Sequence, residues 1–93
     1  MTSNIDLVIS FSARQDIYDV LQYTVEIWGD EQADIYERML DAAFQRLRSF
    51  PEIGHVRDDG VREFAIRHHV ILYRHEAETV TIVRVVHPRR LRD

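Results

Sequence analysis

The sequence has no cysteine and no lysine, and its 93 residues include only three glycines and two prolines. The lack of cysteine excludes disulfide bonds, thiolate nucleophiles and thiolate metal sites, and it fits a reducing compartment. No apolar run approaches the roughly 20 residues needed to cross a bilayer, and the N-terminus does not resemble a signal peptide. We therefore expect a soluble, cytoplasmic protein with no membrane partner.

The chain length predicts a single domain spanning residues 1–93. A second hydrophobic core would require more chain, because domains usually contain about 100–150 residues. A domain of this size has modest stability, so a tightly bound partner would add substantially to it.

The charge is unevenly distributed along the chain, although the net charge is only -4. Residues 1–56 contain ten acidic residues and four arginines, whereas residues 57–93 contain eight arginines and six acidic residues. Arginine has a flat, permanently charged side chain that suits carboxylates, phosphates and aromatic rings. A genome rich in G+C would explain the missing lysine, but only the clustering indicates where a partner binds.

The N-terminal residues alternate between apolar and polar, which predicts a half-buried strand over residues 5–11. Ser12 is expected to cap the following helix, with Gln15 completing a capping box. A helix is predicted over residues 13–28, because Gly29 is a natural breaker. Its expected buried stripe consists of Ile17, Val20, Leu21, Thr24 and Trp28.

A second helix is predicted over residues 31–49, from a cap at Asp30 to the stop at Pro51. The turn between the helices is so short that they must form an antiparallel hairpin. The buried stripe expected for this helix consists of Ala33, Tyr36, Leu40, Ala43, Phe44 and Leu47.

Each helix also carries apolar residues away from its main stripe. Ile35, Met39 and Ala42 form a second strip on one helix, and Tyr18 and Val25 do so on the other. Packing within the hairpin would explain these residues. The alternative is a groove for a partner's helix, since Met adapts readily at binding surfaces.

Residues 50–60 have the composition of a loop, and three strands are expected over residues 61–67, 69–74 and 79–87. The predicted order is β-α-α-β-β-β, an α+β fold whose mostly antiparallel sheet carries the helical hairpin on one face.

Both faces of the last two strands are apolar, whereas a half-exposed antiparallel sheet should alternate. We expect one face to carry Val70, Leu72, Val80, Ile82 and Val86, and the other to carry Ile71, Tyr73, Val83 and Val85. Two helices cover only one face. The C-terminal tail, a long loop or another chain must therefore cover the second.

Several short motifs, taken in order, resemble the RelE/ParE superfamily of type II toxins, on the ParE side. The residues that carry the resemblance are Trp28-Gly29, Gln32-Ala33, Pro51-Glu52-Ile53-Gly54, His69-Val70-Ile71-Leu72-Tyr73-Arg74 and Arg84-Val85-Val86-His87-Pro88-Arg89-Arg90. The resemblance covers nearly the whole chain and implies a RelE/ParE-like fold.

The resemblance implies a toxin of a toxin–antitoxin module that causes growth arrest and plasmid stabilisation. Its expected partners are a cognate ParD-like antitoxin, which folds along the toxin, and DNA gyrase as the inhibited target. No cofactor, no metal and no direct sequence-specific DNA binding by this chain alone are expected. The residues predicted to contact antitoxin or target are Tyr18, Val25, Ile35, Met39, Tyr73, Arg74, Arg84, His87, Arg89 and Arg90.

Two alternatives remain open, a ribosome-dependent mRNA endonuclease of the RelE type and a non-toxic antitoxin-binding module. The nuclease would need cations and proton-transfer groups, for which the candidates are Glu63, Arg67, Arg84 and His87. Strand alternation separates Arg84 from His87, and an acidic, lysine-free chain binds rRNA poorly. Both points favour gyrase inhibition without a catalytic centre.

Some of these residues have simpler structural explanations. Arg84 lies in an apolar strand and needs a partner such as Asp16 or Asp19. His87 is expected to be a strand-end residue. The neighbours of His68, His69 and His75 provide no recognised metal-ligand spacing.

Overall fold

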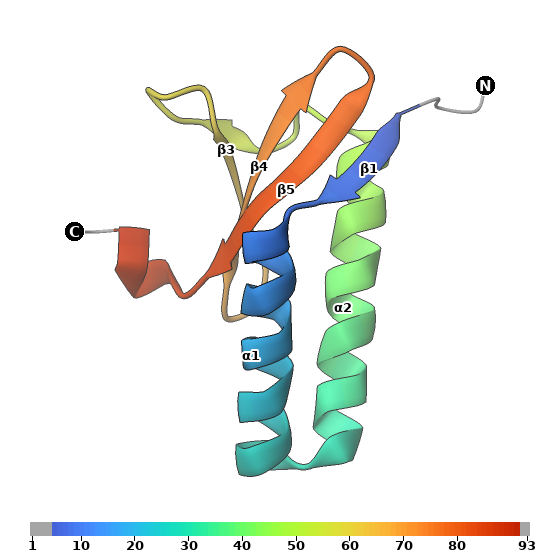
Figure 1. Ribbon diagram of the computed structural model, residues 1–93, viewed down its shortest axis with the longest axis vertical. Coiled ribbons are helices and arrows are strands. Elements are labelled where there is room, and N and C mark those ends of the chain that lie inside the picture. Colours follow the sequence, from blue (N-terminus) through green and yellow to red (C-terminus); the bar gives the residue numbers. More distant parts are fainter. Residues whose placement is uncertain (1–4, 92–93) are drawn as a thin grey trace.

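The structure, a computed structural model, describes residues 5–91, and its elements confirm the predicted α+β architecture (Figure 1). β1 (Asp6–Ile9) leads into α1 (Phe11–Trp28), and α2 (Asp30–Ser49) follows after Gly29. The remaining elements are β2 (His55–Val56), β3 (Arg62–Ala65), β4 (Val70–Glu76), β5 (Thr79–Val86) and the 3-10 helix η1 (Pro88–Leu91). Across residues 5–91, no helix is long and apolar enough to span a membrane.

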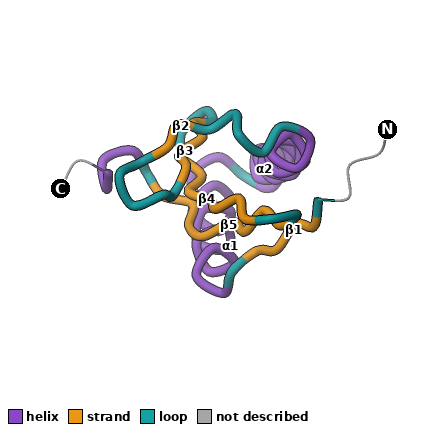
Figure 2. The backbone as a smooth tube through the Cα atoms, turned by 90° about the horizontal axis from the view of Figure 1, so that it is seen from above, coloured by secondary structure: helices purple, strands orange, loops and turns teal. Residues whose placement is uncertain are grey.

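The five strands form one mixed sheet in the order β1-β5-β4-β3-β2. β1 runs parallel to β5, and the other neighbours are antiparallel. Figure 2 shows the strands as one row, with α2 and η1 on opposite sides of it. The predicted three C-terminal strands are confirmed, but the two-residue strand β2 was missed because it falls in a stretch with loop composition.

The cap of α1 lies two residues earlier than predicted. Ser10 Oγ accepts the Ala13 N–H at 3.0 Å and donates to the Val83 carbonyl at 2.9 Å, and the Ser10 N–H donates to the Ile82 carbonyl at 3.0 Å. Ser12 is an exposed residue inside the helix, so the Ser12 prediction is wrong. Ser10 is the cap and Ser12 is not, because only Ser10 forms hydrogen bonds with the backbone of β5.

The predicted stripe of α2 is confirmed, since all six of its residues are buried. Burying each large apolar side chain contributes about 1.5–3 kcal/mol, so this stripe fixes α2 against the sheet. The first helix differs more from the prediction, because Ile17, Val20, Leu21 and Thr24 are only half-buried and Trp28 is 69% exposed. It lies in the last turn of α1, where the hairpin extends beyond the sheet (Figure 1).

A β-bulge changes which way the side chains of β5 point. Leu72 pairs with Arg84, but Tyr73 pairs with Ile82, so Val83 is the extra residue. An extra residue reverses the alternation of the strand on one side of the bulge. Val80 and Ile82 therefore join Ile71, Tyr73 and Val85 on the helix-covered face, and the prediction that they face the other way is wrong.

The second face of the sheet is covered by the chain itself. Val61, Val70, Leu72 and Val86 form a small buried cluster, and Leu91 of η1 packs against it. Of the three predicted covers, the C-terminal tail is thus the one that the structure shows, with help from the residue that precedes β3.

Candidate functional site

A shallow apolar groove runs between α2 and the outer side of β3. It has a volume of about 570 Å³ and is lined by Met39, Ala42, Ala43, Gln45, Arg46, Ser49, Phe50, Phe64, Ala65, Ile66 and Arg67. A second hollow of about 640 Å³ is lined by Arg46, Ser49, Phe50, Pro51, Glu52, Ile53 and His75. The two share Arg46, Ser49 and Phe50, so they form one continuous surface, which we call the α2–β3 groove.

The groove has apolar walls and a basic rim. Phe50 is 60% exposed, and Ile53 is also exposed. Arg46 and Arg67 line the groove, and neither side chain has a hydrogen bond or an ion pair with the described residues. An amphipathic segment with acidic side chains therefore fits this surface.

A buried tyrosine holds the loop that forms one end of the groove. The Tyr73 hydroxyl donates to the Pro51 carbonyl at 2.8 Å and accepts the Gly54 N–H at 2.9 Å. Gly54 is required here, because an added Cβ would lie 2.7 Å from the Tyr73 ring. Arg62 also donates to the Glu52 and Gly54 carbonyls, so residues 51–54 are held from two strands.

Tyr73 was predicted to contact antitoxin or target, and its position corrects this role. The side chain is fully buried, so it lies in the core and cannot touch a partner. Burial also raises its pKa above the usual tyrosine value. Its neighbour Arg74 is exposed on β4 and has no ion pair among the described residues.

The helix residues among the predicted contacts lie in two places. Ile35 and Met39 are on α2, where Ile35 is exposed and Met39 lines the groove. Tyr18 and Val25 are both exposed on α1, with Tyr18 at 59%. The hairpin therefore leaves Tyr18, Val25 and Ile35 uncovered.

Arg84 is bound to Asp16, one of the two partners predicted for it. Its guanidinium donates to both carboxylate oxygens of Asp16 on α1, at 2.7 and 3.0 Å, and Asp16 also accepts the Val85 N–H at 2.9 Å. The hydrogen bond to Asp16, followed by its charge, raises the pKa of Arg84. These contacts join α1 to β5 and occupy Arg84 within the chain.

Tyr36 and three histidines meet where the β3–β4 turn approaches the end of β5. The Tyr36 hydroxyl lies 2.7 Å from His69 Nδ1, and the His69 and His87 ring centroids are 6.2 Å apart. His68 stacks on Tyr36 at 6.3 Å. Burial, and then the charges of His87 and His68, lower the pKa of His69. His69 is therefore mainly neutral at pH 7.

The four nuclease candidates do not form one constellation. Glu63 lies 3.6 Å from Arg57, and Arg84 is bound to Asp16. Glu63 on β3 and Arg84 on β5 pair with Leu72 from opposite sides of β4. Two strand spacings therefore separate their backbones by about 10 Å. Arg67 is in the β3–β4 turn, and His87 is exposed beyond β5, where its Nδ1 accepts the Arg89 N–H at 3.2 Å.

The exposed groove residue Phe50 was missed at the sequence level, although it falls on the same helical strip as Met39 and Arg46. Because Phe50 precedes Pro51, it was assigned to the loop over residues 50–60 and not to a binding surface. Metal binding gains no support from the geometry, since no group of three or more His, Asp or Glu within residues 5–91 is arranged to hold an ion.

Known toxins resemble this chain over most of its length. Toxin ParE1 of Mycobacterium tuberculosis is 33% identical over 86 residues, which cover 88% of each chain. Toxin ParE1 of Caulobacter vibrioides is 34% identical over 82 residues, covering 85% of this chain and 84% of the relative.

A solved structure described as the chromosomal ParDE TA system from P. aeruginosa has the same fold. It superposes with a TM-score of 0.69 at 14% identity, covering 92% of this chain and 98% of that one. Residues 7–92 match the family described as "ParE toxin of type II toxin-antitoxin system, parDE". The chain therefore belongs to the ParE toxin family of type II toxin–antitoxin systems.

Proposed function

We propose that this ParE-family toxin arrests growth by inhibiting DNA gyrase and that a ParD-like antitoxin neutralises it by binding the α2–β3 groove. The groove supports the proposed antitoxin site. Its apolar walls are left uncovered by residues 5–91, and its arginines are not paired with any of these residues. An acidic segment that folds on binding would bury Phe50 and Met39 and pair with Arg46 and Arg67.

One observation favours gyrase over mRNA: the bidentate pair with Asp16 occupies Arg84, one of the two arginines among the nuclease candidates. A nuclease needs a free cation to stabilise the charge that develops on the scissile phosphate. Asp16 is only 13% exposed and already neutralises Arg84, so this cation is not available for a phosphate. Inhibition by surface contact requires no such group.

Gyrase supercoiling, run beside mRNA cleavage on translating ribosomes, tests the target. We expect the purified protein to inhibit supercoiling or to accumulate cleaved DNA, with mRNA left intact. Codon-dependent mRNA cuts with unaffected gyrase would replace this proposal with the nuclease. No effect in either assay, together with no growth arrest on expression, would indicate a non-toxic antitoxin-binding module.

A charge placed in the groove tests the antitoxin site. Ala42 is exposed on α2 and lines the groove, so Ala42→Glu should weaken neutralisation by the antitoxin at least tenfold while gyrase inhibition is retained. Gln32→Glu, exposed in the first turn of α2 and outside the groove, is the matched control. Equal neutralisation of both variants would remove the antitoxin from this groove.

The other predicted contact residues lie outside the α2–β3 groove, and a truncation tests those of the C-terminal tail. We propose that Tyr18 and Val25 on α1, Ile35 on α2, and Arg74, His87, Arg89 and Arg90 of the C-terminal third contact antitoxin or target. Shortening the chain by residues 88–93 should abolish toxicity before it abolishes folding. Unchanged growth arrest by the shortened protein would exclude the tail from target contact.

A further inference from the structure

One end of the sheet gathers positive charge that has no partner within the chain. The β3–β4 turn closes through a 2.9 Å hydrogen bond from the Ile66 N–H to the His69 carbonyl, and Val70 then pairs with Val86. This pairing brings the turn beside the residues that follow β5. We call the exposed residues there, Arg67, His68, His87, Arg89 and Arg90, the cationic end.

The cationic end is held in place by contacts behind it. Leu91 anchors η1 on the second face of the sheet, and the Arg90 N–H donates to the His87 carbonyl at 2.9 Å. Tyr36 orients His69, whose ring meets the His87 ring edge to face. The exposed cations are thus carried on an ordered backbone.

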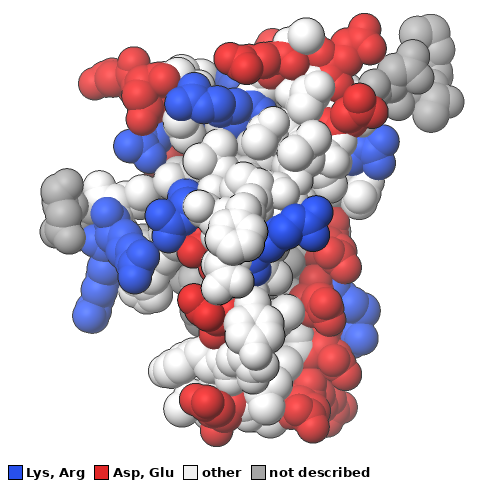
Figure 3. Space-filling model, viewed as in Figure 1, with Lys and Arg blue, Asp and Glu red and all other residues white. Residues whose placement is uncertain are grey.

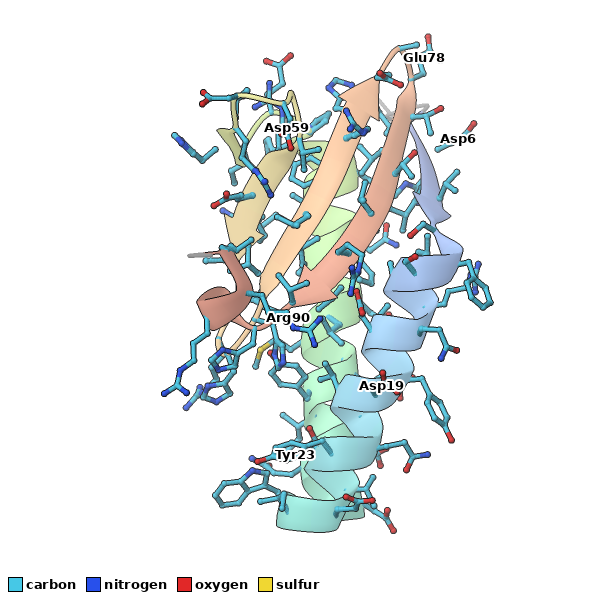
Figure 4. All side chains as sticks on the ribbon, turned by 60° about the vertical axis from the view of Figure 1, so that its left-hand side comes forward. Asp6, Asp19, Tyr23, Asp59, Glu78 and Arg90 are labelled. Atoms are coloured by element: carbon cyan, nitrogen blue, oxygen red, sulfur yellow. The ribbon has the colours of Figure 1, made fainter. Side chains whose placement is uncertain are left out.

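The three arginines of this end are free to bind an anion. The side chains of Arg67, Arg89 and Arg90 form no hydrogen bond or ion pair with residues 5–91, whereas Arg57, Arg62 and Arg84 are all bound internally. Figure 4 shows Arg90 toward the end of the sheet opposite to Asp6, Asp59 and Glu78. In Figure 3, arginine side chains gather over η1 while acidic side chains line α2.

The shape of this end favours a phosphate backbone over a peptide. Neither of the two described hollows includes His68, His87, Arg89 or Arg90, and only Arg67 borders the α2–β3 groove. A peptide gains specificity from pockets for its side chains, whereas spaced guanidinium groups alone suffice for phosphodiesters. The acidic hairpin would repel a polyanion, so the cationic end is the favoured side for its approach.

We propose that the cationic end binds the phosphodiester backbone of duplex DNA, so that the toxin contacts the DNA that gyrase holds as well as gyrase itself. The identity of the DNA rests on the proposed gyrase function, but the contact with phosphates does not. The binding is independent of base sequence and agrees with the expectation that this chain alone has no sequence-specific DNA recognition.

Fluorescence anisotropy with a labelled mixed-sequence duplex and the full-length protein, in the absence of gyrase, tests the proposal. We expect R89Q/R90Q to weaken binding at least tenfold and to lower the slope of log affinity against log salt by about 2, close to 0.9 for each phosphate contact. The control R14Q/R38Q removes two exposed arginines outside the cationic end, and its affinity should stay within twofold of the wild type.

Three outcomes would overturn the proposal. They are no binding by the wild type, equal weakening in both double variants, and tighter binding to a Glu-rich peptide or to single-stranded RNA of equal length. Circular dichroism should give the same melting temperature for both variants, because all four arginines are exposed and form no ion pair with residues 5–91. DNA binding without inhibition of supercoiling would refute the gyrase function and leave the phosphate site standing.

Discussion

The two faces of the sheet are covered by very different amounts of protein. On one face, eleven buried residues from α1, α2, β4 and β5 form the main core, whereas four form the cluster on the other, closed by Leu91. The helix-covered face therefore supplies most of the stability. The second face is a thin layer, and its cover, η1, also carries two arginines of the cationic end.

The largest expected effect comes from truncating one matched residue on each face. Ile82→Ala should lower the free energy of unfolding by about 3–5 kcal/mol, because Ile82 is fully buried in the main core. Leu72→Ala, in the cluster of four, should cost about 2 kcal/mol. Urea denaturation measures both, and equal losses would show that the two faces contribute alike.

The next effect tests a polar contact of the main core. Tyr73→Phe leaves the Gly54 N–H and the Pro51 carbonyl without their partner, so it should cost about 2 kcal/mol. Tyr23 is exposed on α1, and Tyr23→Phe should leave stability unchanged. If Tyr73→Phe is as stable as this control in thermal melts, the loop is held by Arg62 alone.

A smaller effect is expected at the thin cover. Leu91→Ala removes the one η1 side chain that packs on the second face, and should cost about 1 kcal/mol because Leu91 is only half-buried. Hydrogen exchange at the Arg90 amide, bonded to His87, should quicken more than exchange in α2. Protection that stays the same would mean that Pro88 and the backbone turn hold η1 without Leu91.

The smallest expected effect is the contribution of His69 to the pH dependence of stability. Folding lowers the pKa of His69, so the unfolded chain binds its proton more readily and the stability from neutral His69 is lost as the pH falls below the unfolded value of about 6.5. His69→Gln should therefore flatten the decline in the free energy of unfolding between pH 7.5 and 5. An unchanged slope would exclude His69 as a source of the pH dependence.

The periodic parts of the fold could be predicted from the sequence alone. The buried stripe of α2 follows from helical spacing, and the apolar second face of β4 correctly indicated a cover beyond the helices. The pairing of Arg84 also followed, because a cation in an apolar strand needs a carboxylate.

The errors arise where one residue decides the outcome through contacts distant in sequence. The bulge at Val83 reverses Val80 and Ile82, and strand alternation contains no signal for an extra residue. Ser10 caps α1 instead of Ser12 because β5 offers it two carbonyls. Tyr73 is unavailable as a contact because the loop at Gly54 closes over its hydroxyl.

The contacts of Ser10 and Asp16 with β5 have a consequence for how the sheet can grow. Beyond Ile9, these two side chains bond the carbonyl of Val83 and the N–H of Val85, where another strand would otherwise attach. At the opposite margin, β2 pairs only with Arg62 and Glu63, so within residues 5–91 no strand flanks the outer side of Phe64 and Ala65. Beyond β1, the end of β5 is therefore guarded against misplaced strand pairing, whereas the outer margin of β3 leaves room for an incoming strand at Phe64 and Ala65.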